Sequence, residues 1–231
     1  MKSFMKQLTV NPMDSVLKQA IGTLDEHQQA RIAKYWQQAR SRFQEMCDAS
    51  RTQRHGQGLY TTGALAVLSM CNHMRHTPDV DTMQAFATLS DYIAENLNVF
   101  EELDTKVEMY WYAFAEEYRG VMSHSNNRVM EDFQHEVAAA AQVEWMKNPG
   151  QDIRLTAFSA VQTATIAIAR AHTNSTGICA DMTRVSKIAA EQRAHMLDEF
   201  IASMEAKDLV TAEDDLDPEV MLPDDEEIDV L

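Results

Sequence analysis

The sequence predicts an all-α protein: a bundle of about seven helices with antiparallel neighbours, followed by a disordered acidic C-terminal tail. Gly (7) and Pro (5) are scarce among the 231 residues, so the chain lacks the turn-formers that an all-β fold needs. Apolar residues recur at helical spacing along most of the chain. The last two dozen residues combine many acids with scattered apolar residues, a composition that buries too little surface to fold alone.

The first helices are predicted from caps and breakers. Asn11-Pro12 is a cap followed by a first-turn proline, and Thr23–Glu26 has the spacing of a capping box. We therefore expect one long helix from Leu24 to about His55, ended by the glycines that follow. Its apolar residues step by four and three, as in a seam that packs along another helix: Ile32, Trp36, Ala39, Phe43 and Met46.

The middle of the chain predicts three further helices. The first covers about Thr61–His76, and the second, capped by Asp79, covers about Val80–Leu97. The next carries the most aromatic stripe of the protein and is expected to be the central helix of the core. That stripe comprises Phe100, Leu103, Val107, Tyr110, Trp111, Phe114, Tyr118 and Val121.

A turn at Ser123–Asn127 precedes another helix with apolar residues from Met130 onward. Asn148-Pro149-Gly150 is the strongest internal breaker and leaves open a subdomain break near 148–150. Two more helices are expected at about Asp152–His172 and Asp181–Met204. The domain organisation predicted is a single helical domain over 1–207 and a flexible acidic tail over 208–231.

Charge is unevenly distributed along the chain. The formal net charge is −16, of which −11 falls on residues 208–231, so residues 1–207 carry −5. Residues 1–77 hold ten Lys and Arg against five acids, and the remainder to 207 is acidic. Such asymmetry favours a charged partner or subunits that meet head to tail, although solvated helix faces would also produce it.

Motifs of the familiar nucleotide and hydrolase sites are absent, so we expect no cofactor and no catalytic residue. Cys71, His73 and His76 lie close in sequence near a helix end, but a metal needs further ligands. Glu–His pairs four residues apart do not match the three-residue spacing of di-metal bundles. The residues weighed for such a site are Glu116, Glu117, Glu131, His135, His172, Glu191 and His195. No metal site is predicted.

Three features of the sequence bear on the cellular compartment of the protein and on whether it contacts a membrane. Cys47, Cys71 and Cys179 are odd in number and far apart, which favours a reducing compartment. The first residues lack an apolar stretch of signal-peptide length. The longest uncharged run, 155–169, is too short and too polar to span a bilayer and is expected to be a buried helix. We therefore expect a cytoplasmic protein with no membrane contact.

Two surfaces are candidates for partner binding. Cations and aromatic rings on the long N-terminal helix could bind phosphates, although most of them scatter around the helix; they are Arg31, Lys34, Tyr35, Trp36, Arg40, Arg42, Arg51, Arg54 and His55. Of these, Arg51, Arg54 and His55 share one face. The acidic tail could dock in a basic groove with an apolar floor, through Asp214, Asp215, Asp224, Asp225, Glu226 and Glu227.

These features predict a non-enzymatic protein for protein–protein interaction or assembly, acting through helix seams and the acidic tail, with self-association as one form. The alternative is a nucleic-acid-associated protein whose basic N-terminal third is gated by the tail. A third hypothesis, a helical metalloenzyme, requires a bound transition metal. Small acidic helical proteins are common among phage and mobile-element accessory factors, and this analogy suggests a viral accessory or structural protein.

Overall fold

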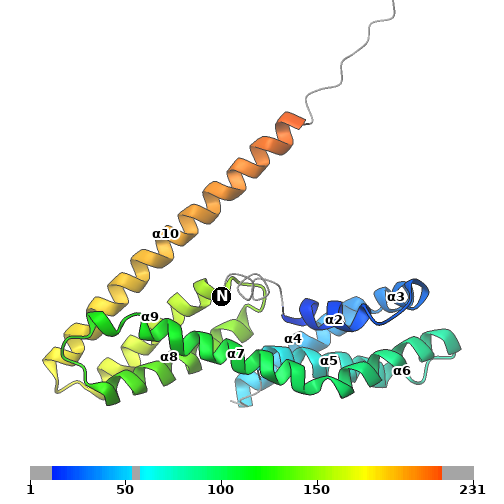
Figure 1. Cartoon of the computed structure of the whole chain (residues 1–231), viewed down its shortest axis with the longest axis horizontal. Coiled ribbons are helices and arrows are strands. Elements are labelled where there is room, and N and C mark those ends of the chain that lie inside the picture. The colour runs from blue at the N-terminus through cyan, green and yellow to red at the C-terminus, as the bar shows by residue number, and fades with distance from the viewer. Residues whose placement is uncertain (1–11, 54–57, 215–231) are drawn as a thin grey trace, which may run out of the picture. The chain divides into compact units, whose positions relative to one another are not determined.

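The computed structural model describes residues 12–53 and 58–214, with side chains given to Met204 apart from those of Met13 and Gln53. Within these ranges the chain forms nine α-helices, one 3-10 turn and no strand, which confirms the all-α helical bundle (Figure 1). The helices are α2 (Pro12–Ile21), α3 (Glu26–Ala33), α4 (Trp36–Gln53), α5 (Leu59–Met74), α6 (Val80–Glu95), α7 (Leu97–Glu116), α8 (Asn127–Lys147), α9 (Ile153–Ala171) and α10 (Thr176–Asp214).

The chain divides into two compact units, one ending at Gln192 and one beginning at Arg193. Helix α10 contributes its first part to unit 1 and the rest to unit 2. The sequence left open a break near 148–150, but α8 and α9 on either side of it belong to unit 1 and pack on each other (Figure 1). Alanines line the buried face of α9, which allows close approach of the two backbones.

Helix α7 contacts α5, α6, α8 and α9 and has five buried residues, against ten in α5, so α5 rather than α7 is the most buried helix of unit 1. Trp111 of α7 meets Trp145 of α8 edge to face at 5.4 Å between ring centroids, and Tyr60 of α5 meets Trp145 at 6.2 Å. Most of the aromatic stripe read from the sequence is buried, including Phe100, Phe114 and Tyr118. Such ring pairs add attraction beyond the area that they bury.

The region expected as one long helix is two helices. The break falls at Lys34 and Tyr35, whose backbone amides donate to carbonyls three residues back, those of Arg31 and Ile32. Such tight turns end an α-helix without glycine or proline, so no local residue announces this one. Ile32, Ala39 and Phe43 of the predicted seam are buried, while Trp36 and Met46 are partly buried.

Cap positions differ from the prediction at α3. Asp25, not Thr23, is the N-cap: its carboxylate accepts from the Gln28 amide at 2.8 Å, and the Gln28 side chain accepts from the Asp25 amide at 3.2 Å. Aspartate and glutamine thus form the reciprocal pair that was assigned to Thr23 and Glu26. The predicted cap of α6 is confirmed, since Asp79 accepts from the Thr82 amide at 3.5 Å.

Helix α10 is longer than predicted at both ends. It begins at Thr176 rather than Asp181, because Ser175 caps it: the Ser175 hydroxyl accepts from the Ile178 amide and its carbonyl from the Cys179 amide. It continues to Asp214, so residues 208–214, placed in the tail by the sequence, are helical. Residues 215–231 lie outside the described part of the chain.

Candidate functional site

The arginines of the predicted nucleic-acid surface are neutralised by carboxylates wherever the structure describes them. Arg31 pairs with Asp79 and Asp81, which joins α3 to the start of α6. The remaining pairs are Arg40–Asp14 at 3.0 Å, Arg42–Glu45 at 2.8 Å and Arg51–Asp48 at 3.1 Å. Phosphate binding needs cations free to face the ligand, and these pairs compete with it.

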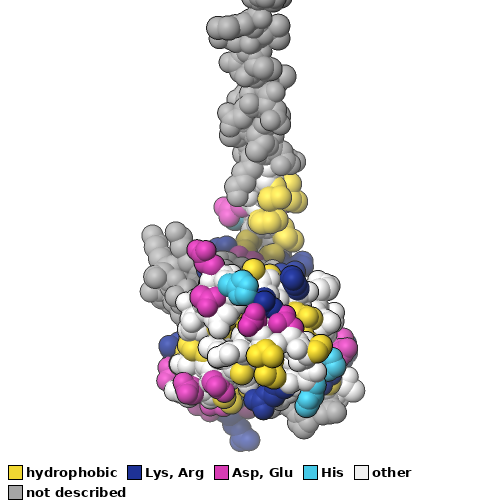
Figure 2. Space-filling view, turned by 90° about the vertical axis from the view of Figure 1, so that its right-hand side faces the viewer, with side chains coloured by type: hydrophobic (Ala, Val, Ile, Leu, Met, Phe, Trp, Pro, Cys, Tyr) yellow, Lys and Arg dark blue, Asp and Glu magenta, His cyan; other side chains and the backbone are white. Residues whose placement is uncertain are grey.

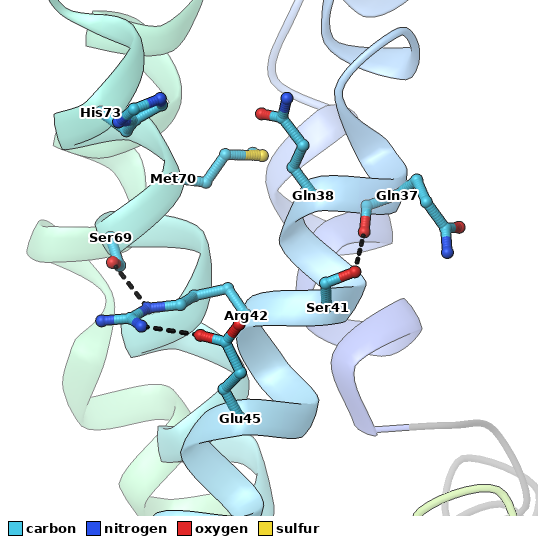
Figure 3. Close-up of a pocket in the computed structure, with 8 residues that line it drawn as sticks. All are labelled: Gln37, Gln38, Ser41, Arg42, Glu45, Ser69, Met70 and His73. Atoms are coloured by element: carbon cyan, nitrogen blue, oxygen red, sulfur yellow. Dashed lines mark hydrogen bonds and ion pairs between the residues drawn. The ribbon is translucent and has the colours of Figure 1, made fainter.

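A groove of about 590 Å³ runs between α4 and α5 and contains one of these arginines (Figure 3). The Arg42 side chain reaches across the groove, where its Nε donates to Ser69 Oγ at 3.2 Å and its Nη1 to Glu45 at 2.8 Å. Ser41 Oγ is engaged as well, since it donates to the Gln37 carbonyl at 3.0 Å. With its cation and a hydroxyl already bonded, the groove offers no preformed anion site.

The predicted metal-ligand candidates do not converge. Among the described residues, no three His, Cys, Asp or Glu side chains are placed to hold one ion. His73 lines the groove between α4 and α5, whereas Cys71 is buried in the core, and burial raises the pKa of its thiol to about 12. His135 Nδ1 bonds the Tyr112 hydroxyl at 2.8 Å, and His195 pairs with Glu199 at 3.3 Å.

Asp104 of α7 performs a structural task that the sequence did not reveal. Its carboxylate accepts from the Tyr60 amide at 2.9 Å, the Thr61 amide at 2.8 Å and the Thr61 hydroxyl at 2.6 Å, so it caps α5. A Cβ on Gly58 would lie 1.9 Å from the Asp104 carboxyl carbon, so glycine is required beside it. Burial raises the pKa of Asp104 against these hydrogen bonds, which lower it.

Asp181 of α10 is a second such carboxylate and is fully buried. It accepts from the His124 amide at 2.7 Å and the Ser125 hydroxyl at 2.9 Å, and the His124 ring lies 3.1 Å away. Burial alone would raise the pKa of Asp181, but the bonds from His124 and Ser125 together hold it below its usual value. The bonds fasten the start of α10 to the turn before α8.

Exposed apolar side chains gather on the part of α10 that belongs to unit 2. Phe200, Ile201 and Met204 are 59%, 53% and 47% exposed, and Met196 and Leu197 before them are partly buried. Their spacing places these five residues, here called the α10 stripe, on one face of the helix (Figure 2). The sequence pattern predicts one broad apolar face that joins four of them to Met182, Val185 and Ile188, yet of these seven residues only Met182 and Val185 are buried.

The residues around the α10 stripe are strongly acidic. Residues 193–214 hold six acids against Arg193 and Lys207, a formal charge of −4, and residues 215–231 add eight acids and no base. On the side of α10 away from the stripe, His195 pairs with Glu199. Unit 2 therefore combines an apolar face with a formal charge of −12.

The other predicted partner-binding residues lie mostly beyond what the structure describes. Arg51 is paired as above, and Asp214 is the last residue of α10, with its side chain undescribed. The remainder are outside the described residues: Arg54, His55, Asp215, Asp224, Asp225, Glu226 and Glu227. The α10 stripe was not among the predicted binding residues, and it lies in the helix that leads into the predicted acidic tail.

None of the helices in the described ranges has the length and apolar character of a transmembrane segment. Comparison with known proteins found no family model, no curated protein and no solved structure that matches the chain.

Proposed function

We propose that this chain is a non-enzymatic interaction or assembly protein whose docking element is the second half of α10. The observation that carries the proposal is the α10 stripe, where three large apolar side chains are about half exposed within two helical turns. Apolar groups clustered on an exposed face characterise surfaces that bind another protein. The acids of the region define the class of partner, since a basic surface complements them.

Burial of the stripe's apolar side chains would provide free energy for binding a partner. Fully burying one Leu- or Phe-sized side chain is worth about 1.5–3 kcal/mol. A partner that covers Phe200, Ile201 and Met204 thus gains several such contributions, from which the entropy of association is subtracted. The acidic residues 214–231 would strengthen encounter with a basic partner and make it dependent on salt, as proposed for Asp214, Asp215, Asp224, Asp225, Glu226 and Glu227.

Site-specific photo-crosslinking in the source cell tests the proposal. A photoreactive phenylalanine analogue replaces Phe200 in one variant and His195, on the back of the same helix, in a matched control. We expect ultraviolet light to join position 200, and not position 195, to another protein chain. Equal adducts from both positions, or none from either, would contradict the proposal.

The nucleic-acid alternative is less supported, because Arg31, Arg40, Arg42 and Arg51 all pair with carboxylates. Its test is DNA and RNA binding by a variant lacking residues 208–231, measured against salt. Binding that weakens steeply as salt rises would revive this alternative.

A cytoplasmic location and an origin among phage or mobile elements stay part of the proposal. The location is supported by the thiols: Cys47 and Cys71 are buried and form no disulfide, and burial raises the pKa of Cys47 to about 12. The suggested origin depends on the analogy of class alone. Fractionation of the source cell and inspection of the neighbouring genes test the two points.

A further inference from the structure

The α10 stripe has a counterpart at the other end of the same sequence. Leu197, Phe200, Ile201 and Met204 have the spacing i, i+3, i+4 and i+7, and Met1, Phe4, Met5 and Leu8 repeat it position for position. Such spacing puts the four apolar residues of the α10 stripe on one side of that helix, and the N-terminal set has the same period in sequence. Residues 1–11 lie outside the described part of the chain, so this comparison is one of sequence.

The two segments differ in the sign of their charge. Residues 1–10 hold Lys2 and Lys6 and no acid, a formal charge of +2, against −4 for residues 193–214. Neither lysine occupies one of the i, i+3, i+4 and i+7 positions of the apolar set. The N-terminal segment is thus a basic, apolar sequence of the kind that the acidic, apolar stripe would select as a partner.

We infer that the α10 stripe of one copy binds residues 1–10 of a second copy, so that chains associate head to tail. The inference rests on the proposed function, because it names the occupant of that docking face. Within the described residues a single chain leaves Phe200, Ile201 and Met204 about half exposed, and a second copy supplies their cover. About two turns of α10, or roughly 12 Å, would be in contact with the segment.

Charge argues against the obvious competitor, a symmetric pair of α10 helices. Such a pair would bring together two segments of −4, each followed by eight further acids, and like charges oppose their approach. The head-to-tail contact joins two different surfaces. A heterologous contact leaves one free surface at each end of a dimer, so it extends into longer assemblies or closes into a ring.

Complementation between two variants tests the inference. The N-terminal variant carries Phe4→Ser, Met5→Ser and Leu8→Ser, and the stripe variant carries Phe200→Ser, Ile201→Ser and Met204→Ser. A control variant, His195→Ser with Ala202→Ser, changes the back of α10. Circular dichroism establishes that each keeps its helices, and sedimentation equilibrium gives the mass of each full-length chain from about 1 to 100 µM.

We expect the mass of the unmodified chain and of the control to rise with concentration. Each of the other two variants alone should remain a monomer, with association weakened at least about tenfold. Mixed in equal amounts, they should form a one-to-one dimer that grows no further, since the pair holds one intact segment and one intact stripe.

Three results would overturn the inference. They are a monomeric unmodified chain at every concentration, an N-terminal variant that associates like the unmodified chain, and a mixture that stays monomeric. Any of them is compatible with crosslinking of position 200 to a different protein, so the proposed function can survive the loss of this inference. Conversely, absence of crosslinks from position 200 to any chain removes both.

Discussion

Asp104 shows how one carboxylate can start a helix that lies 43 residues earlier in the chain. Its two oxygens accept from two backbone amides and one hydroxyl at the first turn of α5. Replacing Asp104 with Ala leaves these donors without an acceptor, and we expect a loss of about 1–3 kcal/mol in the free energy of unfolding. Urea titration followed by circular dichroism measures it.

The matched control for that change is Asp91→Ala, at an exposed position of α6. It should leave the urea midpoint within experimental error, because surface substitutions rarely change stability by more than about 0.5 kcal/mol. Equal losses from the two variants would show that Asp104 does not cap α5.

Asp181 predicts a dependence of stability on pH. Because its pKa in the folded chain lies below the usual value, the carboxylate stabilises the fold above its unfolded pKa of about 3.9 and loses that contribution as pH falls through the folded pKa. Asp181→Asn should therefore cost about 1–3 kcal/mol at pH 7, a difference that shrinks below about pH 4. Urea titrations at several pH values measure the difference between the two chains, with the exposed Asp198→Asn as control.

At the scale of helices, local signals located most elements but not their junctions. Asp79 preceded an apolar period and was read correctly as the cap of α6. The sequence does not reveal the break at Lys34 and Tyr35, because the turn contains neither glycine nor proline. The two helices pack on different partners, α3 on α6 and α4 on α5. Residues 208–214 are predicted to belong to the tail because of their acids. They also contain Leu, Ala and Glu, which favour a helix, and the structure shows them as helical.

The candidate site was only partly predictable, because local sequence signals do not show which helix faces pack together. The spacing of Leu197, Phe200, Ile201 and Met204 was visible in the sequence, but whether that face is buried depends on tertiary packing. Asp104 and Asp181 bond residues 43 to 58 positions away, so nothing beside them in the sequence marks their roles. Periodicity shows which residues share a face and leaves open what that face meets.

Arg31 is expected to stabilise the packing of two helices, because it joins α3 to the start of α6. Its side chain is 21% exposed and bonds Asp81 at 2.9 Å and the Thr82 hydroxyl at 3.0 Å. Arg31→Ala should lower the thermal midpoint by about 2–4 °C. Arg42→Ala is the control, since the Arg42 side chain is 51% exposed and exposed pairs contribute little. Equal midpoints for the two variants would refute a role for Arg31 in holding α3.

In the molecule as a whole, the buried core and most of the net charge belong to different units. The buried apolar core described here runs from Val16 to Ala189, all within unit 1. Unit 2 contributes none of those residues but carries fourteen acids and two bases, so −12 of the total −16 belongs to it. As far as side chains are described, to Met204, unit 2 supplies no core residue, which agrees with the proposed docking role of this part of the chain.

Deleting residues 193–231 tests this separation. The deletion keeps Gln192, whose side chain accepts from the Tyr118 hydroxyl at 2.8 Å, and it reduces the formal charge to −4. Because the core is retained, we expect one cooperative thermal transition with a midpoint within about 3 °C of the full chain. Calorimetry measures the transition, and ion-exchange elution at lower salt reports the lost charge. A midpoint lower by about 10 °C or more would mean that unit 2 helps to hold the fold, and the α10 stripe would then have a structural role.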